Sequence, residues 1–185
     1  MNLLTKGNTK VSALLFDLPT EVCPVQCKSC YAKKAEVRFP NTLAKRRRNY
    51  LAAQQEDFTD SIITEIRKSR INIVRPHSSG DFFSQVYVNK WQTIAATLYD
   101  TNFYAYTKRK QDFDFTHIDE LPNFNLINSL TEDGGYNYGT KEYCDTLVQQ
   151  GYYLCPCIKG HNDTADCMVS CQQCLTEPKV CFEIH

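Results

Sequence analysis

Three cysteines lie close together near the start of the chain. Cys23, Cys27 and Cys30 follow an apolar stretch, with three and then two residues between them. Three thiolates on one short loop can ligate three irons of a [4Fe-4S] cluster, because cysteine sulfur holds such clusters. The fourth iron then stays open to an outside ligand. The triplet therefore predicts an iron–sulfur site, with a zinc site and unliganded buried cysteines as the alternatives.

The spacing of this triplet resembles the cluster loop of radical S-adenosylmethionine enzymes, which follows the first strand of a partial (β/α) barrel. One position differs, because Ser29 stands where those enzymes usually carry an aromatic residue and Tyr31 follows the third cysteine. The resemblance implies that the open iron binds the amino and carboxylate groups of S-adenosylmethionine. Reductive cleavage would then give a 5′-deoxyadenosyl radical, with the cofactor carrying the radical chemistry.

A second cysteine group lies near the other end of the chain. Cys167, Cys171 and Cys174 repeat the three-then-two spacing, and Cys155 and Cys157 precede them. The triplet with Cys155 or Cys157 supplies four thiolates, which would close every iron of a second cluster and suit a structural or electron-relay role. The same four thiolates would also satisfy a tetrahedral zinc ion.

A hybrid site is a further alternative, in which Cys27-x-x-Cys30 and Cys171-x-x-Cys174 share one zinc. Cys144 and Cys181 lie in otherwise regular segments and are predicted to be buried thiols.

Polar residues follow two of the predicted strands. Ser79, Gly80 and Asp81 come soon after the first of these, where glycine allows close backbone approach and Asp81 offers an acceptor to an ammonium or hydroxyl group. Tyr106 and Lys108 stand at the end of the next and are candidate cofactor or substrate contacts. The alternatives are a plain turn with Asp81 capping the next helix, and a basic surface turn at Lys108.

Four consecutive cations, Lys45 to Arg48, lie in a predicted helix. A solvated helix face explains them most simply, because four successive residues point in several directions around a helix. Nucleic-acid binding is a second interpretation. A third is that one arginine points inward as a clamp on an anionic cofactor or substrate.

The composition describes an ordinary globular chain apart from its cysteines. The 185 residues suit one domain, and 21 basic and 21 acidic residues balance. Ten cysteines without a signal-peptide pattern favour a reducing compartment and metal-ligating thiols over disulfides. No stretch is long enough to span a membrane as a helix, so we expect a soluble, cytoplasmic protein.

The elements that position these residues alternate between strands and helices, which predicts an α/β fold with a parallel sheet. Trp91 is predicted to lie in the core. The predicted strands are Val11–Leu18, Ile71–Val74, Asn102–Thr107, Phe124–Leu130 and Lys179–His185. One predicted helix begins near Thr42, two others span Phe58–Arg70 and Val86–Leu98, and a short one ends near Pro122. Thr131–Thr140 reads as a loop that separates the cysteine-rich tail from the rest.

The motifs in this order resemble the phage-associated gene product 88 family, a small radical-SAM-like group, over nearly the whole chain. They are Leu18-Pro19, Cys23-Pro24, Cys27-x-x-Cys30-Tyr31-Ala32, Arg75-x-His77-x-Ser79-Gly80-Asp81-Phe82, Trp91, Phe103-Tyr104-Ala105-Tyr106-Thr107-Lys108, Cys155-Pro156, Cys171-x-x-Cys174 and a terminal Phe-x-x-His.

The resemblance implies a reduced partial (β/α) barrel of radical SAM type in residues 1–140, with a cysteine-rich C-terminal extension in residues 141–185 packed on it as one compact domain. Ser79-Gly80-Asp81 would resemble the element that receives the methionine amino group of the cofactor. Cys155, Cys167, Cys171 and Cys174 would match the family's C-terminal cysteine cluster.

The expected function is therefore that of a radical S-adenosylmethionine enzyme of unknown substrate. It would work with an external electron donor in the cytoplasm of an infected or lysogenic host, away from membranes. A non-catalytic iron–sulfur protein, acting in electron transfer or on a host protein, is the second hypothesis. A zinc-stabilised interaction or nucleic-acid-binding module is the third.

Overall fold

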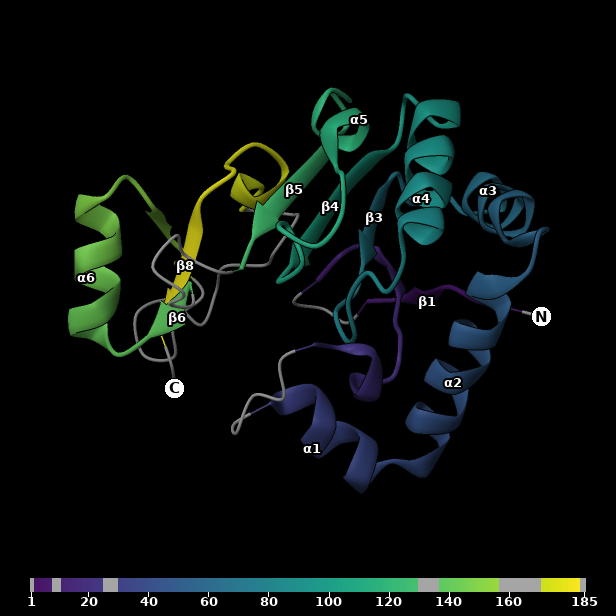
Figure 1. The fold of residues 1–185 in the computed structure, drawn as a ribbon, viewed down its shortest axis with the longest axis horizontal. Coiled ribbons are helices and arrows are strands. Elements are labelled where there is room, and N and C mark those ends of the chain that lie inside the picture. The colour runs from purple at the N-terminus through teal and green to yellow at the C-terminus, as the bar shows by residue number, and fades with distance from the viewer. Residues whose placement is uncertain (1, 8–10, 25–29, 130–136, 157–170, 184–185) are drawn as a thin grey trace.

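A five-stranded sheet forms the centre of the computed structural model, which describes residues 2–7, 11–24, 30–129, 137–156 and 171–183 (Figure 1). The strand order is β1-β2-β3-β4-β5. β1 pairs antiparallel with β2, and the remaining neighbours pair in parallel. The strands are β1 (Thr5–Lys6), β2 (Leu14–Phe16), β3 (Ile73–Pro76), β4 (Asn102–Thr107) and β5 (Phe124–Asn128).

Helices connect the parallel strands, and α3 and α4 pack on one face of the sheet (Figure 1). The described α-helices that precede residue 130 are α1 (Tyr31–Arg38), α2 (Pro40–Gln54), α3 (Phe58–Lys68), α4 (Gln85–Thr97) and α5 (Thr116–Asp119). A short 3₁₀ helix, η1 (Thr20–Val22), follows β2. The predicted α/β class is therefore confirmed, with a mixed sheet.

The helix face of the sheet, as we name it, carries the main core. It comprises Phe16, Val74, Phe103, Ala105 and Leu126, all buried. The predicted periodicity of α3 is confirmed, because its apolar residues recur on one side at helical spacing and are buried against this face. Trp91 of α4 is fully buried in the same core, as predicted.

The opposite side of the sheet is named here the tyrosine face, and it consists of Leu15, Arg75, Tyr104, Tyr106 and Ile127. These residues alternate with those of the helix face along their strands, because successive side chains of a strand point to opposite faces. A second 3₁₀ helix, η2 (Gln173–Leu175), packs near β4 and β5 on this face.

A smaller sheet follows in the chain, with strand order β6-β8-β7. Its strands are β6 (Tyr138–Gly139), β7 (Tyr153–Leu154) and β8 (Val180–Glu183), and α6 (Lys141–Gln149) packs beside them (Figure 1). Cys144 and Cys181 are fully buried, as predicted. Burial raises the pKa of the Cys181 thiol to about 11, and the neighbouring Cys144 adds to this shift.

Several predicted boundaries differ from the structure. α1 was not predicted. β3 begins two residues later than expected, because the N–H of Ile71 donates to the Ser69 hydroxyl and not to a neighbouring strand. The smaller sheet begins at Tyr138, inside the predicted loop, of which residues 131–136 lie outside the described residues. The end of the predicted last strand, with His185, also lies outside them.

Candidate functional site

The carboxyl ends of the parallel strands bring the predicted cofactor residues to one edge of the sheet. His77 N–H donates to the carbonyl of Phe16 at 2.8 Å, and Leu18 N–H donates to the carbonyl of Ser79 at 3.0 Å. These bonds join the chain after β2 to the chain after β3. Ligands of α/β proteins bind at this edge, so the site has the position that its sequence pattern predicts.

The first cysteine loop begins and ends at this edge. Cys23 follows η1, and its N–H donates to the carbonyl of Thr20 at 3.1 Å. Cys30 is the N-cap residue of α1. Both are partly exposed, and Cys27 lies outside the described residues. Two of the three predicted ligands therefore flank the loop with thiols that are accessible to a metal group.

A buried charge network holds both flanks of the loop. The Arg46 guanidinium of α2 donates to Glu36 Oε1 at 3.0 Å and to the carbonyl of Ala32 at 3.1 Å. Glu36 Oε1 also accepts from the N–H of Thr20 at 2.9 Å. Asp17 Oδ2 lies 3.8 Å from Arg46 Nη2. One arginine thus fixes the chain before Cys23 and after Cys30.

Two other cations of the basic run, Lys45 and Arg47, have partners of their own. Lys45 Nζ lies 3.2 Å from the carbonyl of Leu4, and Arg47 bonds Glu21 at 3.1 Å. Arg46 is buried whereas Arg47 and Arg48 are exposed. The predicted inward-pointing arginine is therefore present, but its partners are protein carboxylates.

Asp81 links the loop after β3 to the end of β4. Its Oδ1 accepts from Phe82 N–H and from the Thr107 hydroxyl, both at 2.8 Å, and its Oδ2 accepts from Lys108 N–H at 2.8 Å. Burial raises the pKa of this carboxyl, and the three hydrogen bonds partly offset the shift. The alternative that Asp81 caps α4 is wrong, because the Ser84 side chain caps that helix.

Gly80 adopts a left-handed conformation with a φ of 80°. A Cβ at this position would lie 2.5 Å from the Cβ of Leu18. The close approach that glycine allows here is therefore to the chain that leads into the cysteine loop, and it holds the two loops of the site together.

Three alternate residues within and after β3 carry buried polar atoms that have no hydrogen-bond partner in the described ranges: Arg75 Nε, His77 Nδ1 and Ser79 Oγ. His77 has a φ of 63°, and its Nε2 lies 2.9 Å from the Tyr87 hydroxyl. Burial lowers the pKa of His77 to about 3, and the nearby Arg75 charge lowers it further. Buried polar atoms normally have partners, so this segment is the part of the edge best suited to contact a ligand.

Asp17 belongs to the same edge and was not singled out from the sequence. Its Oδ1 accepts from the Ser78 hydroxyl at 2.6 Å and from Ser79 N–H at 3.2 Å. The signal that would have found it is its place directly after a buried strand, since Asp17 follows β2 just as Lys108 follows β4. The Tyr31 hydroxyl donates to the carbonyl of Ser78, which brings the residue after Cys30 to this loop.

The second cysteine group lies next to the tyrosine face. The Tyr106 hydroxyl lies 2.9 Å from Cys174 Sγ, and Cys155 is buried in a cluster with Ile127. Burial raises the pKa of Tyr106 well above its ordinary value, and the charge of Cys174 adds to the shift. Lys108 is directed toward the smaller sheet, with Nζ 6.0 Å from the Tyr138 ring centre.

The described residues alone contain no group of three His, Cys, Asp or Glu side chains arranged to hold a metal ion. Each predicted ligand set has a member outside the described ranges, Cys27 in the first and Cys167 in the second. The alternative ligand Cys157 also lies outside them. The first set fits a thiolate-bound group in its donor chemistry, because Cys23 and Cys30 offer two partly exposed sulfur atoms at the two ends of one loop. In the second set, Cys171 and Cys174 are partly exposed.

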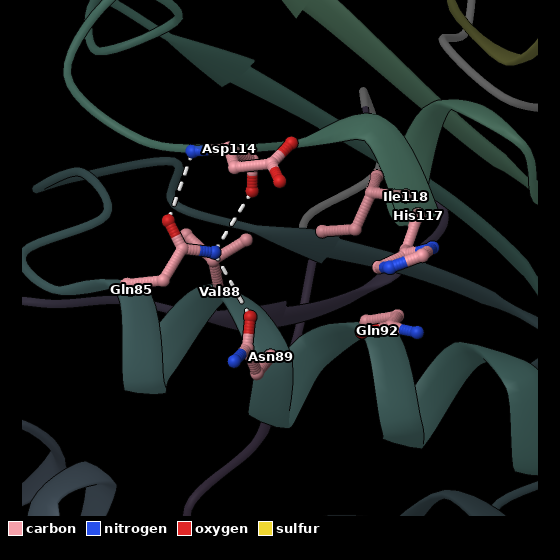
Figure 2. A pocket seen from close by; sticks show the side chains of 7 residues that line it. All are labelled: Gln85, Val88, Asn89, Gln92, Asp114, His117 and Ile118. Atoms are coloured by element: carbon pink, nitrogen blue, oxygen red, sulfur yellow. Dashed lines mark hydrogen bonds between the residues drawn. The ribbon is translucent and has the colours of Figure 1, made fainter.

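A pocket of about 320 Å³ lies between α4 and the segment that leads into α5 (Figure 2). The Gln85 amide crosses it, donating to Asn89 Oδ1 and to the Asp114 carbonyl, each at 2.9 Å. None of the seven residues that line it is a cysteine or a predicted site residue. Its polar groups bond one another, so it adds nothing to the candidate site.

Comparisons with known proteins agree with the sequence motifs. A family model described as gene product 88 matches residues 2–175. The chain is 28% identical to the Gene 88 protein of Mycobacterium phage D29 over 117 residues, which are 57% of this chain and 49% of the relative. It is 28% identical to the Gene 88 protein of Mycobacterium phage L5 over 145 residues, 67% of this chain and 59% of the relative.

The chain thus spans about half of the first relative's length. No solved structure matches the chain. Within the described ranges, no helix is long and apolar enough to cross a membrane.

Proposed function

The chain belongs to the gene product 88 family, and on that premise we propose that it is a phage-encoded iron–sulfur protein with a radical S-adenosylmethionine-type site. Cys23, Cys27 and Cys30 hold a [4Fe-4S] cluster in this proposal. The parallel strands β2 to β5 act as a reduced partial barrel. The supporting observation is that the partly exposed Cys23 and Cys30 flank a loop at the carboxyl edge of the sheet, where three buried polar atoms have no hydrogen-bond partner among the described residues.

When bound, the reduced cluster supplies one electron and S-adenosylmethionine supplies the 5′-deoxyadenosyl group that leaves as a radical. An external electron donor in the host cytoplasm provides the electron. The protein's own contribution is to position these groups and to keep them apart from water. The substrate is a separate molecule or a host protein.

Arg46 and Glu36 position the thiols. They bond Thr20 before the loop and Ala32 after it, so the two ends of the loop are held by one buried ion pair. Buried ion pairs fix geometry because breaking one leaves a charge without compensation. This arrangement holds Cys23 and Cys30 in place before any metal group binds.

Ser79 and Asp81 have different roles in this proposal. The Ser79 hydroxyl is buried and has no hydrogen-bond partner among the described residues, so it is the group that donates to or accepts from the cofactor. Asp81 acts as a positioning residue, because three protein donors already bond its carboxylate. It keeps the Ser79–Gly80 segment aligned with the end of β4.

The C-terminal cysteines hold a second group in the same proposal. Cys155, Cys167, Cys171 and Cys174 would close a second [4Fe-4S] cluster, and zinc is the alternative for these four thiolates. The contact between the Tyr106 hydroxyl and Cys174 Sγ connects this group to the sheet. A group without an open position serves structure or electron transfer.

A non-catalytic iron–sulfur protein is the second candidate function. The observation that favours it is the saturation of Asp81 by protein donors, which leaves this carboxylate little capacity for the amino group of a cofactor. Such a protein would bind its cluster but would not cleave S-adenosylmethionine.

The test is anaerobic purification and reconstitution with iron and sulfide, followed by metal analysis, a visible spectrum and electron paramagnetic resonance of the reduced protein. We expect iron at the first site, a spectral change on addition of S-adenosylmethionine, and formation of 5′-deoxyadenosine. Cluster without the spectral change favours the non-catalytic candidate. Zinc with no iron rejects both.

Cys30→Ala tests the ligand assignment, and Cys144→Ala is its matched control. Both variants remove one thiol, but Cys144 is buried between α6 and β8, away from either ligand set. We expect Cys30→Ala to abolish 5′-deoxyadenosine formation and Cys144→Ala to retain it. Equal activity in the two variants would exclude Cys30 as a ligand.

A further inference from the structure

Arg75 is a cation of the tyrosine face that forms no ion pair with any described residue. Its guanidinium carbon lies 5.6 Å from the ring centre of Tyr104 and 5.2 Å from that of Tyr106. Its Nε is buried and has no hydrogen-bond partner in the described part of the chain. Across the described ranges, no carboxylate forms an ion pair with it within 4 Å, whereas Arg46, Arg47 and Arg109 each have one.

The nearest acidic group is committed elsewhere. Asp17 interacts electrostatically with Arg75, but its carboxylate accepts from Ser78 and Ser79 and faces Arg46. Two tyrosine rings stabilise a guanidinium by roughly 0.5 to 2 kcal/mol each through cation–π attraction. They do so without using its Nε–H donor, which has no hydrogen-bond partner among the described residues.

An arginine in this state is built to receive an oxyanion. The guanidinium stays charged at every relevant pH, and its N–H groups form a rigid fork that matches carboxylate and phosphate oxygens. Flanking aromatic rings keep the fork in one orientation. Tyr31, which directly follows Cys30, also interacts electrostatically with Arg75.

We propose that Arg75 binds an anionic group of the substrate, a carboxylate or a phosphate, beside the rings of Tyr104 and Tyr106. The identification of this anion as a substrate group rests on the proposed function, because it assumes chemistry at the cysteine loop. The anion site itself needs no cluster. It assigns to this protein an acidic substrate whose anionic end is anchored on β3.

The experiment is a titration of the full chain, purified under reducing conditions and labelled with ¹⁵N-arginine. The probes are inorganic phosphate in one series and acetate in the other, at constant ionic strength. We expect a saturable shift of the Arg75 Nε–H signal, assigned by its absence in Arg75→Lys. A stronger response to phosphate identifies a phosphorylated substrate, and a stronger response to acetate identifies a carboxylic acid.

Arg75→Gln provides the affinity comparison. The matched control is Arg67→Gln, which changes an exposed arginine of α3. Calorimetric titration should show at least a tenfold loss of affinity for the preferred anion in Arg75→Gln and no change in Arg67→Gln. Arg75→Lys should fall between them, because it keeps the charge and loses the fork. No saturable shift with either probe in the unaltered protein overturns the inference, and so does equal affinity in Arg75→Gln.

Failure of this inference is separable from failure of the proposed function. Anion binding by a chain that assembles no iron–sulfur cluster leaves the Arg75 site standing and rejects the proposed function. Formation of 5′-deoxyadenosine by a chain whose Arg75 binds no anion leaves the proposed function standing and rejects the Arg75 site.

Discussion

The helix face and the tyrosine face of the central sheet are built from the same strands but differ in what they bury. The helix face packs Phe16, Phe103 and Leu126 against α3 and α4, with Trp91 at the centre. The tyrosine face places Arg75 beside the rings of Tyr104 and Tyr106, and Tyr106 contacts Cys174 of the second cysteine group. The first face holds most of the apolar contacts that stabilise the fold, and the second holds groups that suit binding.

The alternation of side chains along each strand makes this division possible. Val74 and Arg75 are neighbours in the chain, yet one is fully buried in the main core and the other faces the tyrosines. A substitution on one face therefore leaves the other face largely intact. The comparison predicts large stability effects on the helix face and small ones on the tyrosine face.

The largest effect is expected from Trp91→Ala. Trp91 is fully buried, with ring centres of Phe16 and Phe58 at 5.7 and 6.0 Å. Removing a buried aromatic side chain leaves a cavity and costs about 4 kcal/mol of unfolding free energy. Urea denaturation measures it, and Tyr99→Ala, an exposed aromatic at the end of α4, is the control with a change below about 0.5 kcal/mol.

A smaller loss of unfolding free energy is expected from Arg46→Met, which removes the buried guanidinium that bonds Glu36 and Ala32. Removing the guanidinium leaves the buried Glu36 carboxylate uncompensated, which costs about 3 kcal/mol. Arg48→Met on the exposed side of the same helix should change the unfolding free energy by less than about 0.5 kcal/mol. Equal denaturation midpoints for the two variants would contradict a buried ion pair.

The pairing of Arg46 with Glu36 is tested by a double-mutant cycle. Because Arg46 and Glu36 contact each other, the loss in Arg46→Met/Glu36→Met should be smaller than the sum of the single losses. Additive losses would mean that the two side chains act independently.

Acid should weaken the helix face through His77. Its pKa is lowered to about 3 in the folded protein by burial and then by Arg75, against about 6.5 in the unfolded chain. The unfolded chain therefore binds more protons between these values, and stability falls as the pH falls. Between pH 7 and pH 5 the loss is about 2 kcal/mol. Denaturation midpoints across this range measure it.

The control for this pH dependence is His77→Asn, since asparagine tolerates the left-handed conformation of this position. The variant should lose most of the acid sensitivity between pH 7 and pH 5. Asp81 acts with the opposite sign, because its raised pKa makes the folded protein bind a proton more readily as the pH falls. An unchanged slope in His77→Asn would exclude His77 as the source.

The smallest stability effect is expected from Tyr106→Phe on the tyrosine face. The substitution removes the hydroxyl that lies 2.9 Å from Cys174 Sγ and keeps the ring against Arg75. Loss of one hydrogen bond costs about 1 kcal/mol. The sharper measurement is the rate at which a thiol reagent modifies Cys174, which should change in Tyr106→Phe and stay unchanged in Tyr99→Phe.

The longer elements of the fold could be predicted because their residues carry a local pattern. The helical spacing of Phe58, Ile62 and Ile66 and the alternation in Asn102–Thr107 are examples. α1 could not be predicted, because one of its buried residues is Glu36, whose place is set by Arg46 of the next helix. Two-residue strands such as β6 are too short to show a period.

The site was predictable in position and less so in detail. Residues that follow parallel strands had to meet at one edge, and Cys23, Ser79 and Asp81 do so. Whether the Asp81 carboxylate would face a ligand or the end of β4 depends on the neighbouring strand, which the local sequence does not specify. The isolation of Arg75 could not be predicted, since it depends on which carboxylates lie within reach.

The short strand β1 has a consequence for how copies of the protein meet. It covers the outer side of β2 with only Thr5 and Lys6, both exposed, and Lys45 contacts the carbonyl of the adjacent Leu4. A brief edge strand that carries lysine is a poor template for pairing with another chain. The sheet is therefore protected on this side against aggregation through strand addition.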